Sequence, residues 1–310
     1  MENSSAITEY TNRIQYHLCT THSTGKQWAF FSAINFFFTI TAILGNLLVL
    51  AALHKESSLH PPSKLLYRCL AVTDLLVGLI SEPSFAVYEA VLAKENHLAN
   101  VCCYFATISE VTFTTLSAVS LLTMTTISVD RLLALLLGLR YRYNVTLRRV
   151  RTLVTMYWFL GVGFAVMMIW EFTFAKVYNY TLISICIFVS LFCYLRILFT
   201  LRLNQIQAQQ QQGQPNGLGI SFNIARYRKT VTTAVWVQVT LIACYLPYGI
   251  VMVIFAIHGS SPFLDVMWEA TASLVCLNSS LNPILYCWKI QEVKQEVRNT
   301  IRQLFCLSNQ

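Results

Sequence analysis

Charged residues are scarce in this chain of 310 residues. Asp, Glu, Lys and Arg together make up 12% of the sequence, whereas soluble domains usually carry about 25%. Hydrophobic residues make up 55%, and the mean hydropathy is +0.54. This balance excludes an ordinary water-facing surface over most of the molecule. We therefore expect much of the apolar surface to face membrane lipid.

Several catalytic and binding patterns are also absent from the sequence. The ten Cys include no Cys-x-x-Cys pair and no Cys/His cluster, which argues against a structural zinc site. No nucleic-acid-binding module accompanies the net charge of +8. All six His lie near predicted aqueous ends, so the membrane interior offers no His-based catalytic set. We expect no catalytic residues and no enzyme, and the lack of internal repeats argues against a transporter.

Seven apolar runs are each long enough to cross a membrane as a helix, since a hydrocarbon core of roughly 30 Å needs about 20 residues. Helices and closed barrels are the structures that satisfy the backbone in lipid, and unbroken runs of this length favour helices. The predicted fold is all-α: a seven-transmembrane helix bundle with a short amphipathic cytoplasmic helix after the last span. We expect three prolines to kink their helices. The runs are Trp28–Leu53, Lys64–Leu92, Ala99–Leu135, Val150–Phe172, Tyr178–Leu203, Lys229–Ile257 and Leu264–Cys287, and the prolines are Pro83, Pro247 and Pro283.

The distribution of basic residues predicts the orientation of these helices. Four of the 22 Lys and Arg, namely Arg13, Lys26, Lys94 and Lys176, fall on one side, and the others lie in or beside the opposite connections. Because cytoplasmic loops are enriched in Lys and Arg, the richer side is cytoplasmic. We expect a multi-pass plasma-membrane protein with its amino terminus outside the cell.

This topology divides the chain into three parts. Residues 1–27 form an extracellular tail, and residues 28–288 form the membrane domain. In residues 289–310, apolar positions recur at helical spacing with Lys and Arg between them, which is typical of an amphipathic helix on the inner membrane surface.

Three covalent modifications are expected at the two surfaces. Asn3 and Asn179 begin Asn-x-Ser/Thr sequences on the outer side and are candidate glycosylation sites. Cys306 follows the amphipathic segment and is a candidate for palmitoylation. An unmodified cysteine is the alternative at that position.

Polar residues of three helices are predicted at one depth near the membrane midplane. Asp74 lies ten residues beyond Lys64, roughly 15 Å along its helix, and Ser120 lies 11 residues before Arg131, roughly 16 Å along its own. One carboxylate among neutral oxygens suits a hard monovalent cation such as sodium. Interhelical hydrogen bonding around a protonated Asp74 is the alternative. The predicted sodium ligands are Asp74, Ser120, Asn278, Ser279 and Asn282.

A second polar group lies at the cytoplasmic end of the third helix. Asp130 and Arg131 are adjacent there, and on spacing alone a solvated helix end explains them well. Tyr194 and Tyr286 are expected near the same level. Both hydroxyls could reach Arg131 through hydrogen bonds if the helices move, although each tyrosine alone is more often a packing residue.

Acidic residues gather toward the outer ends of the helices. Glu82, Glu110 and Glu269 each lie a turn or two inside the outer end of a helix. Around an outward cavity, three acids would favour a cationic ligand or a metal ion, with ordinary rim solvation as the alternative. Phe113 and Tyr245 could add an apolar lining, or could be core or lipid-facing residues.

Taken together, these residues resemble the pattern of the rhodopsin-like (class A) G protein-coupled receptors over about Ser32 to Cys306. One such motif would be weak evidence, but several in the right order and depth are specific. The motifs are Gly45-Asn46, Leu70-Ala71-Val72-Thr73-Asp74, Ser128-Val129-Asp130-Arg131, Leu139-Arg140-Tyr141, Trp158, Cys244-Tyr245-Leu246-Pro247 and Asn282-Pro283-Ile284-Leu285-Tyr286.

The resemblance implies roles for the polar groups. The midplane set matches an allosteric sodium pocket that collapses on activation, which favours the ion interpretation. Arg131 matches the arginine that pairs with Asp130 at rest and engages a heterotrimeric G protein when the sixth helix swings outward. Tyr194, Tyr286, Asn282 and Pro283 match the remainder of the activation switch. Arrestin and a receptor kinase are further expected partners beside membrane lipid, and no cofactor is required.

Departures from the family pattern narrow the resemblance. Leu132 and Tyr245 replace a usual tyrosine and tryptophan, and Cys186 stands near the usual proline of the fifth helix. The second outer loop, about Thr173–Val177, is very short and has no Cys, so the usual outer disulfide cannot form. Cys19 paired with Cys102 or Cys103 is the substitute hypothesis.

These departures resemble the melanocortin receptors, within the wider group of adenosine, cannabinoid and lysophospholipid receptors. Melanocortin receptors keep acids for calcium near the depth of Glu82 and Glu110, so calcium at the outer pocket is a further expectation. An amine receptor is disfavoured, because Phe113 stands where those receptors carry an aspartate. We expect a divergent or orphan receptor that binds an extracellular ligand, such as a cationic peptide, and activates a G protein. The alternatives are a lipid or nucleoside receptor of the same family and a membrane transporter.

Overall fold

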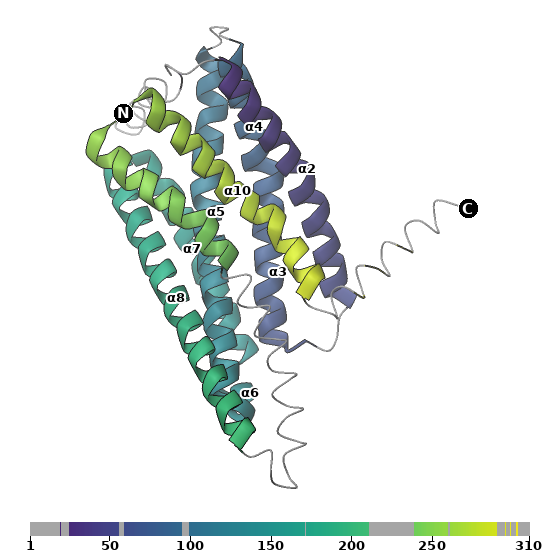
Figure 1. The fold of residues 1–310 in the computed structure, drawn as a ribbon. Helices are drawn as coiled ribbons and strands as arrows, with labels where there is room; N and C mark the ends of the chain where they lie inside the picture. Colours follow the sequence, from purple (N-terminus) through teal and green to yellow (C-terminus); the bar gives the residue numbers. More distant parts are fainter. Residues whose placement is uncertain are drawn as a thin grey trace.

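The computed structural model describes residues 19, 25–55, 59–94, 99–170, 172–210, 239–259, 261–289, 295, 298 and 302. Every regular element in these ranges is helical. The predicted amphipathic helix after residue 289 lies mostly outside the described residues. Figure 1 shows the helices running side by side along the length of the molecule.

Seven spans make up the described bundle. Six of them are long and apolar enough to cross a membrane, and α10 is the seventh. α10 carries polar residues such as Glu269, Asn278 and Asn282 along its length. The spans are α2 (Gly25–Lys55), α3 with η1 and α4 (Pro61–Leu76, Val77–Ser81 and Glu82–Ala93), α5 (Ala99–Leu137), α7 (Leu147–Trp170), α8 (Phe172–Gln210), the helix Val239–His258 and α10 (Pro262–Lys289).

The second span changes its winding just before Pro83. Proline has no backbone N–H and its ring clashes with the carbonyl four residues earlier. Here the π-helical turn η1 (Val77–Ser81) precedes the proline, and α4 begins at Glu82 with Pro83 in its first turn. A π turn inserts one extra residue into a helix. The predicted kink at Pro83 therefore takes the form of a local rewinding.

The connection between α7 and α8 is shorter than the sequence suggests. The segment Thr173–Val177 was expected as the second outer loop, and that prediction is wrong. α7 ends at Trp170 and α8 begins at Phe172, so the expected loop forms the first turns of α8. Residues such as Phe174 and Ala175 have no helix-breaking feature, and Ala175 is completely buried against Phe164 and Met168.

Glycine sets the spacing of α2 against its neighbours. A Cβ added at Gly45 would lie 2.9 Å from the Cβ of Pro283 in α10, and one at Gly78 would lie 3.0 Å from the Cβ of Ala42. Neither distance is compatible with ordinary carbon contacts. The two glycines thus allow α2 to pack closely against α10 and η1.

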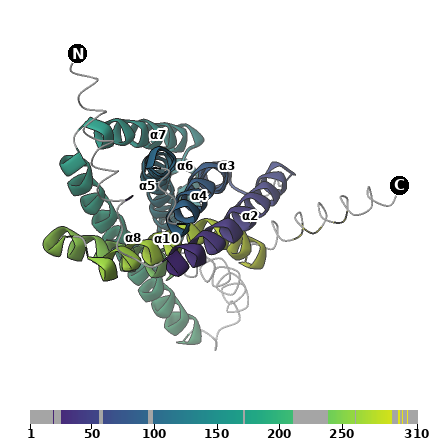
Figure 2. The ribbon, with the colours of Figure 1, turned by 90° about the horizontal axis from the view of Figure 1, so that it is seen from above.

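α5 lies near the middle of the bundle. It packs against α3, α4, α7 and α8, and Figure 2 shows these helices around it. We call the end of the bundle near Gly25 and Ala93 the outer end and the end near Lys55 and Arg131 the inner end, following the predicted topology.

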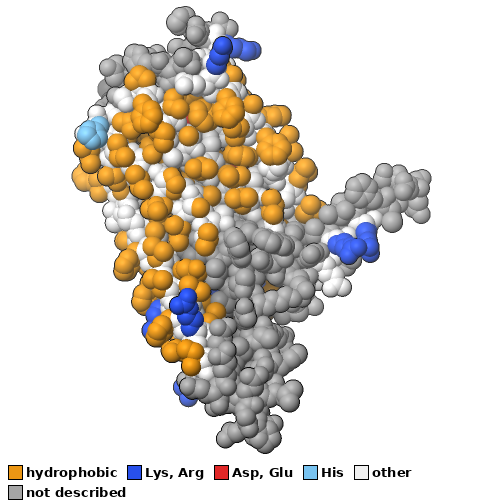
Figure 3. All heavy atoms as spheres, in the orientation of Figure 1, with side chains coloured by type: hydrophobic (Ala, Val, Ile, Leu, Met, Phe, Trp, Pro, Cys, Tyr) orange, Lys and Arg blue, Asp and Glu red, His pale blue; other side chains and the backbone are white. Residues whose placement is uncertain are grey.

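The outward surface has the composition that lipid requires. Figure 3 shows hydrophobic side chains along the helices, with the visible Lys and Arg toward the ends of the bundle or beyond it. Phe36, Phe159 and Phe188 are more than half exposed to the surroundings of the chain. Because large exposed apolar surfaces mark interaction or membrane sites, this surface supports the prediction of a lipid-facing bundle.

Candidate functional sites: a midplane pocket and a switch at the inner end

Asp74 is the centre of a buried polar pocket between α3, α5 and α10. Its side chain is fully buried. Ser279 Oγ donates to Oδ1 at 2.9 Å, Ser120 Oγ donates to the same oxygen at 3.4 Å, and Asn282 Nδ2 donates to Oδ2 at 2.8 Å. The structure therefore brings together four of the five predicted sodium ligands.

The fifth predicted ligand, Asn278, points elsewhere. Its Nδ2 donates to Met124 Sδ at 3.4 Å, and its buried Oδ1 has no partner among the described residues. Asn278 precedes Ser279 on α10, and neighbouring helical residues point about 100° apart. Asn278 therefore does not join Ser279 and Asn282 in contacting Asp74.

Asn46 and Pro283 connect α2 to this pocket. Because Pro283 has no N–H, the carbonyl of Ser279, four residues earlier, lacks its helical donor. Asn46 Nδ2 supplies one at 3.1 Å and also donates to Ala42 O at 2.9 Å. The Gly45-Asn46 pair thus serves two purposes: the glycine admits the proline ring, and the asparagine satisfies the carbonyl that the proline frees.

At the inner end, Asp130 accepts hydrogen bonds from three directions. Arg131 Nη2 lies 2.8 Å from Asp130 Oδ2. Ser63 Oγ, at the start of α3, donates to the same oxygen at 2.9 Å, and Tyr141 Oη donates to Oδ1 at 2.5 Å. We call Asp130, Arg131, Ser63 and Tyr141 the inner latch. It joins three separate segments of the chain, because Tyr141 begins the short helix α6 (Tyr141–Asn144) after the 3₁₀ turn η2 (Gly138–Arg140).

Arg131 is largely enclosed by this latch. Its guanidinium lies 5.7 Å from the ring centroid of Tyr67, within the range of a cation–π contact. Tyr194 of α8 is half-buried, and no contact places it on Arg131 in this arrangement of the described residues. The side chain of Tyr286 lies outside the described residues, so its predicted role stays a prediction.

The outer acids are buried rather than arranged around an open mouth. Glu82 is fully buried and Glu269 is 4% exposed, whereas Glu110 is half-buried. The described residues contain no group of three His, Cys, Asp or Glu suited to a metal ion. The expected open acidic cavity therefore does not form here, because helix packing encloses Glu82 and Glu269.

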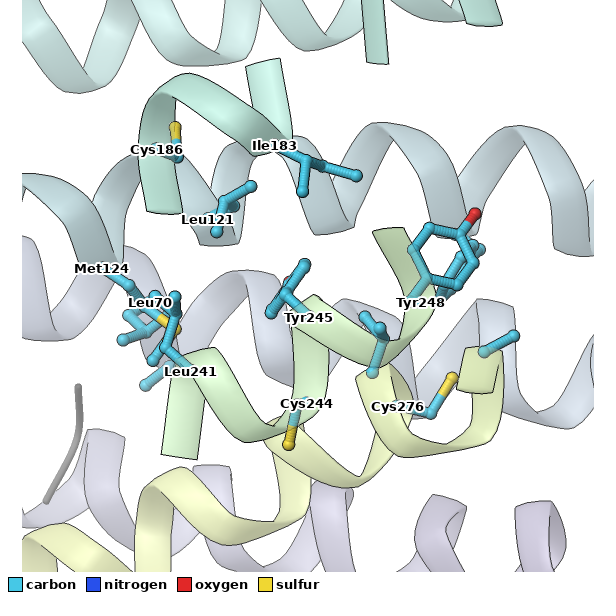
Figure 4. Close-up of a cluster of buried hydrophobic side chains, with 14 of the residues drawn as sticks. Leu70, Leu121, Met124, Ile183, Cys186, Leu241, Cys244, Tyr245, Tyr248 and Cys276 are labelled. Carbon is cyan, nitrogen blue, oxygen red and sulfur yellow. The ribbon is translucent and has the colours of Figure 1, made fainter. Parts of the chain in front are cut away.

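Phe113 and Tyr245 belong to the packed interior. Phe113 contacts Phe85 and Tyr248 edge-on, with ring centroids 5.4 and 5.9 Å apart. Tyr245 is buried and its Oη donates to Ser117 O at 3.4 Å. Figure 4 shows Tyr245 and Tyr248 among the surrounding apolar side chains. A cavity of about 10 Å³ remains beside them, which is close to the minimum for one water molecule.

A disulfide bond links the amino-terminal segment to α5. Cys19 and Cys102 form a disulfide, with Cα atoms 6.1 Å apart. Cys103 remains a free, buried thiol whose Sγ lies 3.8 Å from Cys19 Sγ. The structure thus contains the Cys19–Cys102 pairing, one of the two that the sequence left open. The Sγ atom of Cys103 is also close to Cys19.

The predicted glycosylation of Asn179 is contradicted. Asn179 lies inside α8, is 8% exposed and lines the small cavity beside Phe113 and Tyr248. A buried helical asparagine leaves no room for a glycan. Asn3 and Cys306 lie outside the described residues, so their modifications stay predictions.

Sequence reasoning missed several members of these sites. Ser63 and Tyr67 gave no signal, because neither residue type is unusual near a helix end. Tyr141 was noted only as part of a motif. The contact of Asn35 with Glu89, at 2.8 Å, joins two helices that are distant in sequence and has no local signature.

Comparison with known proteins agrees with this geometry. The family model of the seven-transmembrane receptors of the rhodopsin family matches residues 45–180 and 168–286. The chain belongs to this family. It is therefore a multi-pass membrane receptor rather than an enzyme, and membership implies G protein-coupled signalling in response to an extracellular ligand.

Curated relatives include two melanocortin receptors and a histamine H2 receptor. Melanocortin receptor 4 of Danio rerio is 25% identical over 280 residues, which cover 86% of this chain and 81% of the relative. Melanocortin receptor 5 of Mus musculus is 22% identical over 286 residues, covering 88% and 84%. The histamine H2 receptor of Cavia porcellus is 28% identical over 294 residues, covering 89% and 79%.

Proposed function

We propose that this receptor responds to an extracellular cationic ligand by releasing the inner latch and activating a heterotrimeric G protein at the plasma membrane. The observation that supports this proposal is the enclosure of Arg131. Its guanidinium is bound to Asp130 and lies against Tyr67. An arginine that contacts a partner must first leave these interactions, so the enclosed arrangement corresponds to the resting state.

The latch provides the two-state element that such a switch requires. Asp130 accepts from Arg131, Ser63 and Tyr141 together. Movement of the inner ends of the helices would break these charge-assisted hydrogen bonds at once, which makes intermediate positions unfavourable. Arrestin and a receptor kinase would act on the same inner face after activation.

The Asp74 pocket is the proposed allosteric sodium site. Three donors hold the carboxylate in place, and the hydroxyl oxygens of Ser120 and Ser279 lie 3.4 and 2.9 Å from it. These two hydroxyls could turn their lone pairs to a cation beside the carboxylate. The ion would stabilise the resting state by joining α3, α5 and α10.

We further propose a chemical class for the extracellular ligand, namely a cationic peptide. Two relatives are melanocortin receptors by name, and the outer half contains Glu82, Glu89, Glu110 and Glu269. Of these four acids, Glu110 is half-buried and the other three are buried, so Glu110 is the acid that would pair with a cationic peptide and repel an anionic ligand. A small amine is disfavoured despite the histamine H2 relative, because Phe113 is buried between Phe85 and Tyr248 and offers no counter-ion.

A lipid ligand is the second candidate, and a groove between α8 and the helix Val239–His258 favours it. The groove has a volume of about 490 Å³, within the range of small-molecule sites. Its lining is almost entirely apolar, and Tyr180 and Ser184 add hydroxyls. Gly249 lacks a side chain on its wall and so keeps it wide.

The experiment measures nucleotide exchange on a panel of G proteins with peptides, lipids and nucleosides as ligands. Arg131→Ala should abolish activation while surface expression stays within about twofold of the parent, because the arginine binds the partner. Arg140→Ala, in the neighbouring turn, is the matched control and should keep most activity. Full activation by Arg131→Ala would overturn the proposed mechanism.

A further inference from the structure

The groove between α8 and the helix Val239–His258 lies apart from the midplane pocket and the inner latch. Toward the outer end the two helices are joined by Tyr180 of α8, whose Oη donates to Met252 O at 3.4 Å. They approach again nearer the midplane, where a Cβ added at Gly249 would lie 3.7 Å from Ile183 Cγ2 and meet nothing else within 4 Å. The groove is therefore a gap between two neighbouring helices, and Gly249 leaves room in its wall.

The rim of the groove belongs to the lipid-facing surface of the bundle. Phe188 and Ile250 line the groove and are more than half exposed. Because the groove is continuous with a surface that contacts lipid, a molecule of the bilayer can enter it sideways. None of the residues that line it is charged, so it offers no partner to a charged headgroup.

The groove covers the depth of one leaflet. The membrane span of α8 begins at Val177 and has 27 residues, about 40 Å, which matches the hydrocarbon core with its interfacial margins. Tyr180 lies about 4.5 Å inside this edge, near the start of the hydrocarbon. Leu191, at the other end of the groove, lies about 21 Å inside it, near the midplane. A lipid of the outer leaflet that filled the groove would therefore reach from the interface to the midplane.

Two hydroxyl groups lie at the shallow end of this otherwise apolar groove. Tyr180 and Ser184 are four residues apart on α8 and so share a face. Thr181, which is exposed beside them, donates to Val177 O at 2.8 Å, a common way for a helical hydroxyl to be satisfied. Ser184 makes no such bond to the described part of the chain, and Tyr180 Oη keeps lone pairs that can accept. The groove thus offers a donor and an acceptor to a ligand hydroxyl.

We propose that this groove binds a sterol-type lipid of the outer leaflet, an uncharged molecule with one hydroxyl and a rigid apolar body. The sterol hydroxyl donates to Tyr180 Oη and accepts from Ser184 Oγ, and the body extends along the groove toward Leu191. Such a lipid satisfies the Ser184 hydroxyl, which is costly to leave unpaired in hydrocarbon. The site rests on the membrane-spanning fold and is separate from the site of the extracellular agonist.

The walls of the groove favour a rigid ligand over a flexible acyl chain. Many of the lining side chains are β-branched and therefore have few rotamers, so the walls adapt little. A rigid body also loses less conformational freedom on binding than a chain with many rotatable bonds. The β-branched lining residues are Ile183, Ile187, Ile250, Val253 and Ile254.

The first test locates the lipid. The purified full-length receptor in phosphatidylcholine nanodiscs is labelled with a photoreactive cholesterol analogue, and the labelled peptides are mapped. Labelling of α8 around Ser184 should saturate and should be displaced by excess cholesterol. Gly249→Phe should abolish this labelling, because the added ring fills the groove. Gly163→Phe is the matched control and should leave it unchanged, since it adds the same ring to an open surface of α7.

Hydroxyl variants test the polar end of the groove with little change in packing. Ser184→Ala should weaken the saturable labelling about fivefold, the effect of one hydrogen bond. Thr181→Val should leave it unchanged, because the Thr181 hydroxyl already bonds to its own helix. Labelling that does not saturate, or that is equal in Gly249→Phe and Gly163→Phe, would mean surrounding lipid only and would overturn the proposal. Saturable labelling by a photoreactive phosphatidylcholine would assign the groove to an acyl chain and overturn the sterol.

The second test follows the consequence for signalling, and only this test rests on the proposed function. A sterol in the groove contacts both α8 and the helix Val239–His258, so it stabilises their present arrangement, which is the proposed resting state. Basal nucleotide exchange should fall severalfold when cholesterol is added to the nanodiscs, in the parent and in Gly163→Phe but not in Gly249→Phe. An equal fall in Gly249→Phe contradicts the link to signalling. A receptor that activates no G protein contradicts the proposed function and leaves the labelling result standing.

Discussion

Buried acids in the inner and outer halves of the bundle differ in how many hydrogen-bond donors surround them. Asp74 and Asp130 each accept hydrogen bonds from three side chains of neighbouring segments. Glu82 and Glu269 are equally buried, yet oxygens of both lack donors among the described residues. The inner half thus contains its own partners, and its state depends on whether they separate. The buried acids of the outer half have fewer side-chain donors among the described residues than Asp74 and Asp130 have.

The largest expected effect comes from breaking the inner latch at its acid. Asp130→Asn removes the charge that holds Arg131 and should raise basal G protein activation about tenfold, which corresponds to about 1.4 kcal/mol. Basal nucleotide exchange without ligand is the measurement. Tyr141→Phe removes one of the three donors and should give a smaller rise in the same direction. Unchanged basal exchange in both variants would show that the latch does not restrain the receptor.

The next largest effect is expected from Asp74, at the midplane, on the sodium dependence of agonist binding. Asp74→Asn keeps the size of the side chain and removes its charge, so added sodium should no longer weaken agonist binding. The measurement is agonist affinity in sodium and in an equal concentration of a large organic cation. Glu82→Gln, eight residues along the same span, is the matched control and should keep the sodium response. A sodium response that survives Asp74→Asn would exclude this pocket as the ion site.

Adding a methyl group is expected to reduce stability more where α2 packs against α10 than on the open surface of α7. Gly45→Ala places a Cβ 2.9 Å from two carbons of Pro283, and such overpacking typically costs about 1–3 kcal/mol. Gly163→Ala in α7 meets nothing within 4 Å and should be neutral or slightly stabilising. Thermal unfolding in detergent compares the two. Equal melting temperatures would mean that α2 and α10 adjust freely.

The smallest effect is expected at the outer tether. Cys102→Ser should leave the amino-terminal segment attached, because Cys103 Sγ lies 3.8 Å from Cys19 Sγ and can take over the pairing. Non-reducing peptide mapping should find Cys19 joined to Cys103 in this variant. Cys19→Ser is the control and should leave Cys102 as well as Cys103 as a free thiol. Free Cys19 in the Cys102→Ser variant would show that only one pairing is accessible.

The membrane spans and the depth of the midplane polar residues could be predicted from the sequence. Apolar runs located the spans, and helical spacing placed Asp74 and Ser120 at one depth. The orientation of individual side chains was harder to predict, since Asn278 contacts Met124 instead of Asp74. Contacts between distant segments were not predictable, because Ser63, Tyr141 and Asp130 meet only through the tertiary structure.

The error at Asn179 has a related cause. A glycosylation sequence was assigned to the outer side because the apolar run starts near Tyr178. α8 in fact begins at Phe172, which moves Asn179 almost two turns into the helix and toward the core. The apolar run marks where a helix meets lipid, whereas the helix itself extends into segments whose composition gives no such signal.

The π turn Val77–Ser81 also affects how this receptor is aligned with others. One extra residue rotates everything beyond it by about 100° relative to a continuous α-helix. Counting outward from Asp74 therefore assigns Ser84, Phe85 and Glu89 to the wrong faces in any relative whose second span winds differently. Ligand-contact positions transferred from such a relative to α4 should be numbered from Pro83, and receptor chimaeras should exchange the turn together with the outer segment.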